Sequence, residues 1–140
     1  EIDKKFSGLI WITPEYKNNS KEEIISILNI KNYLEKDNRQ KMLLTNYSFF
    51  SALLNQKLFS PTRWFIENGV AHPLKDNEYF QQYQNFLIKK IKENKIKVIY
   101  TIKPANIFFL KQALGEKCIK TSNVSNMLDA HSVLNCAKLE

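Results

Sequence analysis

The stretch that decides the fold is YFQQYQNFLIKKIKENKIKVIYTIKP, residues 79–104. Its first part has apolar residues at helical spacing, which predicts an amphipathic helix that Asn77 can cap. The expected buried face of that helix consists of Tyr79, Tyr83, Phe86, Leu87 and Ile91. Its second part, Ile96–Pro104, is a β-branched apolar run that ends at proline, which predicts a buried strand.

Towards the C-terminus, ANIFFLKQALG (residues 105–115) predicts a second helix, closed by Gly115. KCIKT (residues 117–121) predicts a short edge strand, and MLDAHSVLNC (residues 127–136) predicts either a last helix or a last strand. The segment that follows the decisive strand therefore continues the alternation of helix and strand.

Towards the N-terminus, the same alternation holds. GLIWITP (residues 8–14) and KMLLTNY (residues 41–47) predict strands. SKEEIISILNIKNYLEKD (residues 20–37) predicts an amphipathic helix, in which Ser20 and Glu23 form a capping box. SFFSALLNQ (residues 48–56) predicts a short helix.

This alternation predicts an α/β fold of three layers, with a mostly parallel, Rossmann-like sheet covered by helices on both faces. In such folds ligands bind outside the carboxyl ends of the strands. Those ends fall at Thr13–Pro14, Thr45–Tyr47 and Thr101–Pro104.

The length of 140 residues, with 44% hydrophobic and 25% charged residues, predicts a single domain over residues 1–138. The chain begins with Glu1 rather than Met and ends with Leu139 and Glu140, which resemble a cloning remnant. We therefore expect a part excised from a longer protein. Its longest apolar runs are far shorter than the roughly 20 residues of a membrane helix.

The net charge of +7 raises the question of a nucleic-acid partner. The lysines are spread along the chain, and arginine, the preferred reader of bases and phosphates, occurs only at Arg39 and Arg63. With three glycines the chain has no glycine-rich phosphate loop, and His72 and His131 are too few for a metal site. We expect no nucleic acid, cofactor, metal or catalytic residue in this chain.

SPTRWFIENGVAHPLKDNEYF, residues 60–80, is a long connection without a regular period, yet it is rich in aromatic residues. Such a connection is usually either functional or disordered, and disordered segments are poor in aromatics. Arg63 beside Trp64 suits a sugar or a phosphate, because an indole stacks on apolar faces and a guanidinium binds anionic oxygens. The alternative is a loop anchor, with Trp64 in the core and Arg63 bound to carbonyls or to Glu67.

Thr45, Asn46 and Tyr47 place a hydroxyl, an amide and a phenol at a predicted strand end. The alternative is that they cap the following helix. His72 precedes a proline and is expected to shape the loop. We hypothesise that the 60–80 loop forms one wall of a ligand-binding cleft, where Arg63, Trp64 and His72 meet the strand end at residues 45–47.

Cys118 and Cys136 fit no zinc or CxxC spacing. They form either one disulfide, if the domain lies outside the cytoplasm, or two buried thiols.

Five features, GLIWITPEY, KMLLTNYSFFSALL, SPTRWF, the 79–104 stretch and a late cysteine, occur together along most of the chain. Together they resemble the C-terminal soluble region of bacterial multi-spanning membrane glycosyltransferases related to the dolichyl-phosphate-mannose protein mannosyltransferases. Those enzymes take sugars from polyprenyl-phosphate donors.

The resemblance implies a parent enzyme in the inner membrane with this domain in the periplasm. The catalytic acidic residues of that family lie in loops of the membrane part, so none is assigned here. The domain would bind the glycan acceptor or cover the membrane active site. Its partners would be the membrane part of the same polypeptide and a glycan or polyprenyl-phosphate sugar. A periplasmic location also favours a Cys118–Cys136 disulfide.

Two other functions stay open. A soluble Rossmann-like enzyme domain would show strongly perturbed titration in its cleft. A structural interaction module would show an exposed apolar patch on the Tyr79–Ile91 helix.

Overall fold

The computed structural model describes residues 4, 7–8, 16, 19–62, 72–103, 107–137 and 139. The chain forms two compact units. The first unit consists of Glu1–Asn38 and Phe49–Gln56, and the second of Arg39–Ser48 and Lys57–Glu140. Each unit is described by itself below.

The first unit contains helices α1 (Ser20–Lys36) and α2 (Phe50–Leu54), which contact each other. The predicted cap of α1 was wrong by one residue. The Oδ1 atom of Asn19, not a Ser20 hydroxyl, accepts a hydrogen bond from the Glu22 amide at 3.3 Å. The Asn19 Nδ2 atom in turn donates to the Glu22 carboxylate at 2.7 Å. Asparagine is a strong N-cap residue, which explains why the helix begins one position earlier than a serine cap allows.

The second unit is built on a four-stranded sheet in the order β1-β2-β4-β3. The strands are β1 (Lys41–Leu44), β2 (Val98–Ile102), β3 (Ile119–Asn123) and β4 (Leu128–Val133). β1 pairs with β2 in parallel, and β4 pairs antiparallel with both β2 and β3. The described sheet is therefore mixed, because the segment at 127–136 contains the strand β4, which forms a hairpin with β3 and pairs antiparallel with β2 on its other side. Most of the expected strand at residues 8–14 lies outside the described residues.

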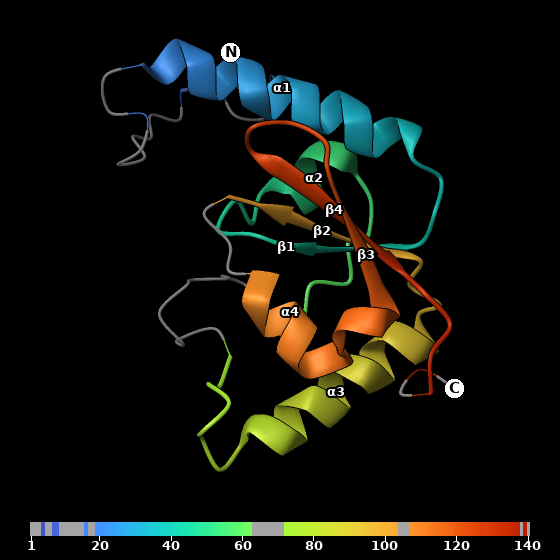
Figure 1. The fold of residues 1–140 in the computed structure, drawn as a ribbon. Helices are drawn as coiled ribbons and strands as arrows, with labels where there is room; N and C mark the ends of the chain where they lie inside the picture. Colours follow the sequence, from blue (N-terminus) through green and yellow to red (C-terminus); the bar gives the residue numbers. More distant parts are fainter. Residues whose placement is uncertain are drawn as a thin grey trace. The chain divides into compact units, whose positions relative to one another are not determined.

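Two helices, α3 (Phe80–Glu93) and α4 (Ile107–Leu114), lie together against one face of this sheet (Figure 1). Side chains from both helices and from the sheet form one buried apolar core. From the helices it includes Leu87, Ile91, Phe109, Leu110, Ala113 and Leu114, and from the strands Met42, Leu44, Ile99 and Ile119. The central strand β2 is buried along all five residues, as its continuous apolar sequence predicted.

The buried face of α3 differs from the prediction. Leu87 and Ile91 are buried, but Tyr79 and Phe86 are 61% and 40% exposed. The third buried residue is Gln84, whose amide donates to the carbonyls of Gln112 and Ala113 at the end of α4. Contact with α4 thus turns α3 so that a polar residue faces inward, and hydrogen bonds compensate for its burial.

A disulfide joins Cys118 to Cys136, with the two Cα atoms 5.4 Å apart. Cys118 ends the short 3-10 helix η3 (Glu116–Cys118), directly before β3, and Cys136 follows β4. Near the disulfide, the Leu134 amide donates a backbone hydrogen bond of 2.8 Å to the Cys118 carbonyl. The disulfide therefore closes the open end of the β3–β4 hairpin.

Candidate functional site

The carboxyl end of β1 carries Thr45, Asn46 and Tyr47, and the structure gives them different roles. The Thr45 hydroxyl accepts a hydrogen bond from the Tyr47 amide at 2.9 Å, which closes a tight turn. Thr45 and Tyr47 are buried, whereas Asn46 is exposed. Of these three residues, Asn46 is the one placed to meet a ligand, and Thr45 shapes the turn that presents it.

The ends of β2 and β4 add polar groups at the same edge of the sheet, because the register pairs Leu44 with Thr101 and Ile102 with Leu128. The Lys103 ammonium lies 3.9 Å from the Asp129 carboxylate, and its side chain is 47% exposed. The other oxygen of that carboxylate accepts from the Asn123 amide at 2.7 Å. The edge thus offers an exposed amide and a partly exposed cation.

The 60–80 loop starts beside β1. The Leu43 amide donates to the Leu58 carbonyl at 3.0 Å, and the Ser60 hydroxyl donates to the Leu43 carbonyl at 2.6 Å. These bonds hold the chain against β1 just before the loop begins. Arg63 and Trp64, the pair that we expect from the sequence to bind a ligand, lie outside the described residues.

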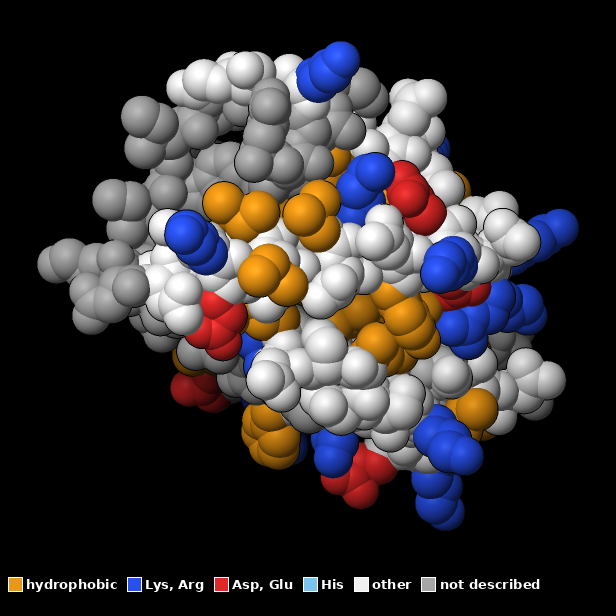
Figure 2. Space-filling model, turned by 90° about the horizontal axis from the view of Figure 1, so that it is seen from above, with side chains coloured by type: hydrophobic (Ala, Val, Ile, Leu, Met, Phe, Trp, Pro, Cys, Tyr) orange, Lys and Arg blue, Asp and Glu red, His pale blue; other side chains and the backbone are white. Residues whose placement is uncertain are grey.

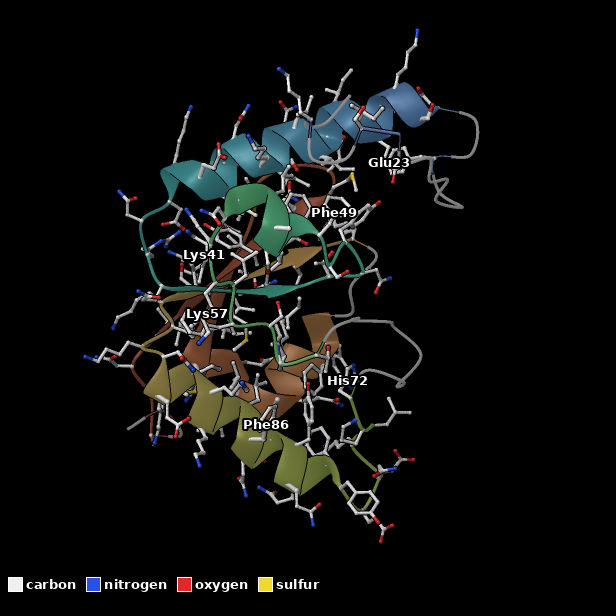
Figure 3. The ribbon with its side chains drawn as sticks, turned by 180° about the vertical axis from the view of Figure 1, so that it is seen from behind. Glu23, Lys41, Phe49, Lys57, His72 and Phe86 are labelled. Atoms are coloured by element: carbon white, nitrogen blue, oxygen red, sulfur yellow. A yellow bond between two sulfur atoms is a disulfide. The ribbon has the colours of Figure 1, made fainter. Side chains whose placement is uncertain are left out.

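His72, near the other end of the loop, is only 4% exposed. Its ring stacks on Phe109 of α4 with the centroids 3.8 Å apart, and Tyr83 of α3 lies 6.4 Å away (Figure 3). Burial lowers the pKa of His72 and raises the pKa of Tyr83 to about 12. A neutral imidazole packed on aromatic rings fits the loop-shaping role better than a ligand contact.

The second histidine forms an arrangement that the sequence did not reveal. His131 of β4 is fully buried, and its two ring nitrogens lie 2.9 Å from the hydroxyls of Thr101 on β2 and Thr121 on β3. Burial lowers the pKa of His131, and the Asp129 charge opposes that effect. A neutral imidazole has one donor and one acceptor, so it satisfies both threonine hydroxyls and ties three strands together.

We expect the unfolding free energy to fall as the pH drops below about 6.5, the ordinary pKa of histidine. The unfolded chain takes up a proton there, whereas buried His131 stays neutral until lower pH. His131→Gln should cost about 1–3 kcal/mol at pH 7.5, because a threonine hydroxyl loses its partner. Urea unfolding between pH 5 and 7.5 measures both quantities. An equal pH slope in His131→Gln and the wild type would contradict this role.

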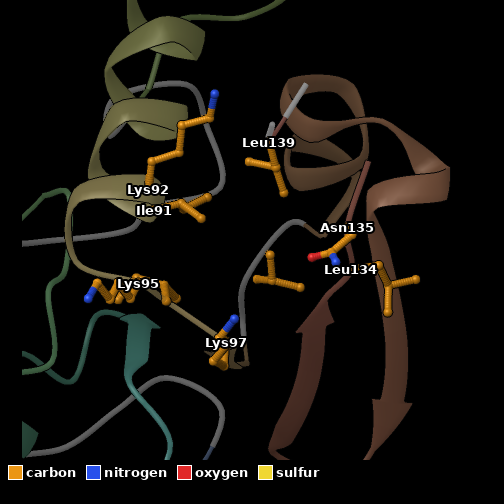
Figure 4. Close-up of a pocket in the computed structure, with 9 residues that line it drawn as sticks. Ile91, Lys92, Lys95, Lys97, Leu134, Asn135 and Leu139 are labelled. Carbon is orange, nitrogen blue, oxygen red and sulfur yellow. The ribbon is translucent and has the colours of Figure 1, made fainter. Parts of the chain in front are cut away.

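A pocket of about 400 Å³ lies at the opposite, amino-terminal edge of β1 and β2 (Figure 4). Its lining comes from the end of α3, the link between α3 and β2, the last residue of β4 and the segment after it. It includes the three lysines Lys92, Lys95 and Lys97 together with Asn135 and apolar side chains. Sequence reasoning missed this pocket because its lysines were treated as part of a dispersed surface charge.

The surface elsewhere shows mixed character. On the face drawn in Figure 2, basic and acidic side chains lie around a few small groups of hydrophobic ones. No helix in the described part of the chain is both long and apolar enough to cross a membrane. Within the same residues no group of three or more His, Cys, Asp or Glu side chains could hold a metal ion.

The described residues thus define a mixed α/β sheet domain, closed by a disulfide, with a polar strand edge and a basic pocket. Comparisons with protein-family models, curated proteins and solved structures find no match to this chain.

Proposed function

We propose that this chain is a non-catalytic, extracytoplasmic accessory domain of a membrane glycosyltransferase. In this proposal it binds the glycan acceptor or covers the membrane active site. The observation that carries the proposal is the Cys118–Cys136 disulfide. Disulfides persist in oxidising compartments such as the periplasm, which is where the sequence resemblance places this domain.

The carboxyl edge of β1 and β2 is the proposed binding surface. Exposed Asn46 and partly exposed Lys103 supply hydrogen-bond donors there. The 60–80 loop begins beside the same strand, where Ser60 holds the Leu43 carbonyl. Arg63 and Trp64 follow within four residues of this anchor, and in this proposal they bind the ligand. His72 serves as the second anchor of the loop.

The finer architecture is part of the same proposal. A three-layer, Rossmann-like arrangement with helices on both faces of the sheet would give this edge the usual ligand position of α/β folds. Residues 8–14 would contribute a further strand, as their apolar sequence predicts.

The test uses the full-length protein in membranes and measures sugar transfer from radiolabelled polyprenyl-phosphate sugars to acceptor. Arg63→Ala/Trp64→Ala is expected to lower transfer at least about tenfold, because arginine and tryptophan anchors dominate binding energies. The matched control, Lys75→Ala, changes an exposed residue of the same loop and should leave transfer unchanged. Full activity in a double variant that folds normally would refute the binding role.

A second candidate function is supported by the exposed apolar side chains on and before α3. Leu74, Tyr79 and Phe86 are 53%, 61% and 40% exposed. Such residues favour a structural module that packs α3 against a protein partner. In that case Tyr79→Ser/Phe86→Ser would lower transfer by the full-length enzyme, whereas Arg63→Ala/Trp64→Ala would not.

A further inference from the structure

The pocket at the amino-terminal edge of the sheet combines positive charge with an apolar floor. Lys92 lies in the last turn of α3, Lys95 in the turn that follows, and Lys97 directly before β2. Ile91, Ile96 and Val133 are among the apolar residues that line the pocket with them. None of the described residues that line the pocket is acidic.

The positive charge of this pocket is not neutralised from within. Within the described ranges, none of the three lysines has an acidic oxygen within ion-pair distance, whereas nearby Lys89 is paired with Glu93 at 3.7 Å. The positive charge of Lys92 interacts favourably with the helix dipole, because Lys92 lies in the last turn of α3. Lys97 lies between α3 and β2, outside the last turn of the helix, so it lacks this interaction. In Figure 4 its amine points into the hollow opposite Asn135, whereas Lys95 turns away.

The rim opposite the lysines is fixed in place by the covalent structure. Asn135 precedes Cys136, and the Leu139 amide donates to the Cys136 carbonyl at 2.8 Å. The disulfide ties this segment to Cys118. Leu139 adds only an apolar wall, so Lys92, Lys97 and Asn135 carry the inference.

We propose that this pocket binds the phosphate headgroup of an anionic phospholipid and so docks the sheet domain on a membrane surface. The Lys97 ammonium and the Asn135 amide, on facing sides of the hollow, suit a phosphodiester, and Lys92 adds positive charge at the other end of the pocket. The apolar lining, which includes Ile91 and Val133, would meet the glycerol and first acyl carbons. A free inorganic anion would make no use of the apolar floor. The proposal rests on the proposed membrane association, and its test does not use glycosyl transfer.

The test measures co-sedimentation of the 140-residue chain with vesicles at 0.15 M salt. We expect binding to vesicles containing phosphatidylglycerol and not to pure phosphatidylcholine. Lys92→Glu/Lys97→Glu should lower the partition coefficient at least about tenfold, since each lysine near an anionic surface contributes substantially. The matched control Lys75→Glu/Lys120→Glu makes the same change of net charge at exposed positions outside the pocket and should change it less than about twofold.

A second measurement separates lipid from free phosphate. NMR titration with short-chain phosphatidylglycerol, below its micelle concentration, should shift the amide signals of Lys97, Leu134 and Asn135. Inorganic phosphate at the same concentration should not. Equal losses in the two double variants would mean non-specific charge attraction and would overturn the pocket. Equal shifts with inorganic phosphate would overturn the lipid assignment. Either result leaves the glycosyltransferase proposal intact, because transfer is measured separately.

Discussion

Replacing Phe109 with alanine is expected to lower the free energy of unfolding by about 3–5 kcal/mol, the range for buried aromatic side chains. Phe109 is 2% exposed and belongs to the core that joins α3, α4 and the sheet. Its ring also supports the stacked imidazole of His72 and lies 5.6 Å from the ring of Tyr83. Urea unfolding followed by circular dichroism measures the loss.

The chain supplies its own control for this substitution. Phe108, the preceding residue, is 59% exposed, so Phe108→Ala should change the unfolding free energy by less than about 1 kcal/mol. The Phe109 variant should also be cleaved faster within residues 60–80 by a low concentration of protease, because His72 loses its stacking partner. Equal effects of the two alanine variants would show that the ring cluster does not anchor the loop.

Reduction of the Cys118–Cys136 disulfide is expected to lower the free energy of unfolding by about 3 kcal/mol. The two cysteines are 18 residues apart. A disulfide that closes a loop of this size lowers the entropy of the unfolded chain, which stabilises the folded state by about 3 kcal/mol. Comparing unfolding with and without a reducing agent isolates this effect, because no side chain is replaced. If the reduced and oxidised proteins have the same free energy of unfolding, the disulfide does not stabilise the fold and the prediction is wrong.

Much of the second unit could be predicted from the sequence, because local patterns decide it. The continuous apolar run at residues 98–102 has no polar face, so it could form only a buried strand. Helix α4 ends at Leu114, and Gly115 follows it with a φ of +94°, which confirms the prediction that Gly115 closes this helix. The short edge strand expected at residues 117–121 is β3, Ile119–Asn123, which lies at the edge of the described sheet.

What could not be predicted depends on contacts between distant segments. The insertion of β4 between β2 and β3 makes the sheet mixed, and no local pattern in residues 127–136 reveals its pairing. The inward position of Gln84 depends on carbonyls at the end of α4, 28 and 29 residues away. Likewise His131 has a role only because Thr101 and Thr121 are its neighbours in the sheet.

The candidate site divides in the same way. A strand end with a polar triplet could be located from the sequence, but which of Thr45, Asn46 and Tyr47 is exposed depends on the turn that Thr45 closes. The basic pocket unites lysines from a stretch of six residues with Asn135 from the far end of the chain. Only the folded sheet brings these two segments together, so the sequence alone does not reveal the pocket.

The central claim, an extracytoplasmic domain of a membrane enzyme, is tested most directly by the location of this domain in the cell. Two reporters are each fused behind residue 138 of the full-length protein. Alkaline phosphatase is active only after export, and green fluorescent protein does not fluoresce after export through the general secretory route. The account predicts an active phosphatase and a dark fluorescent protein, both in the membrane fraction. A fluorescent fusion with an inactive phosphatase would place the domain in the cytoplasm and contradict the account.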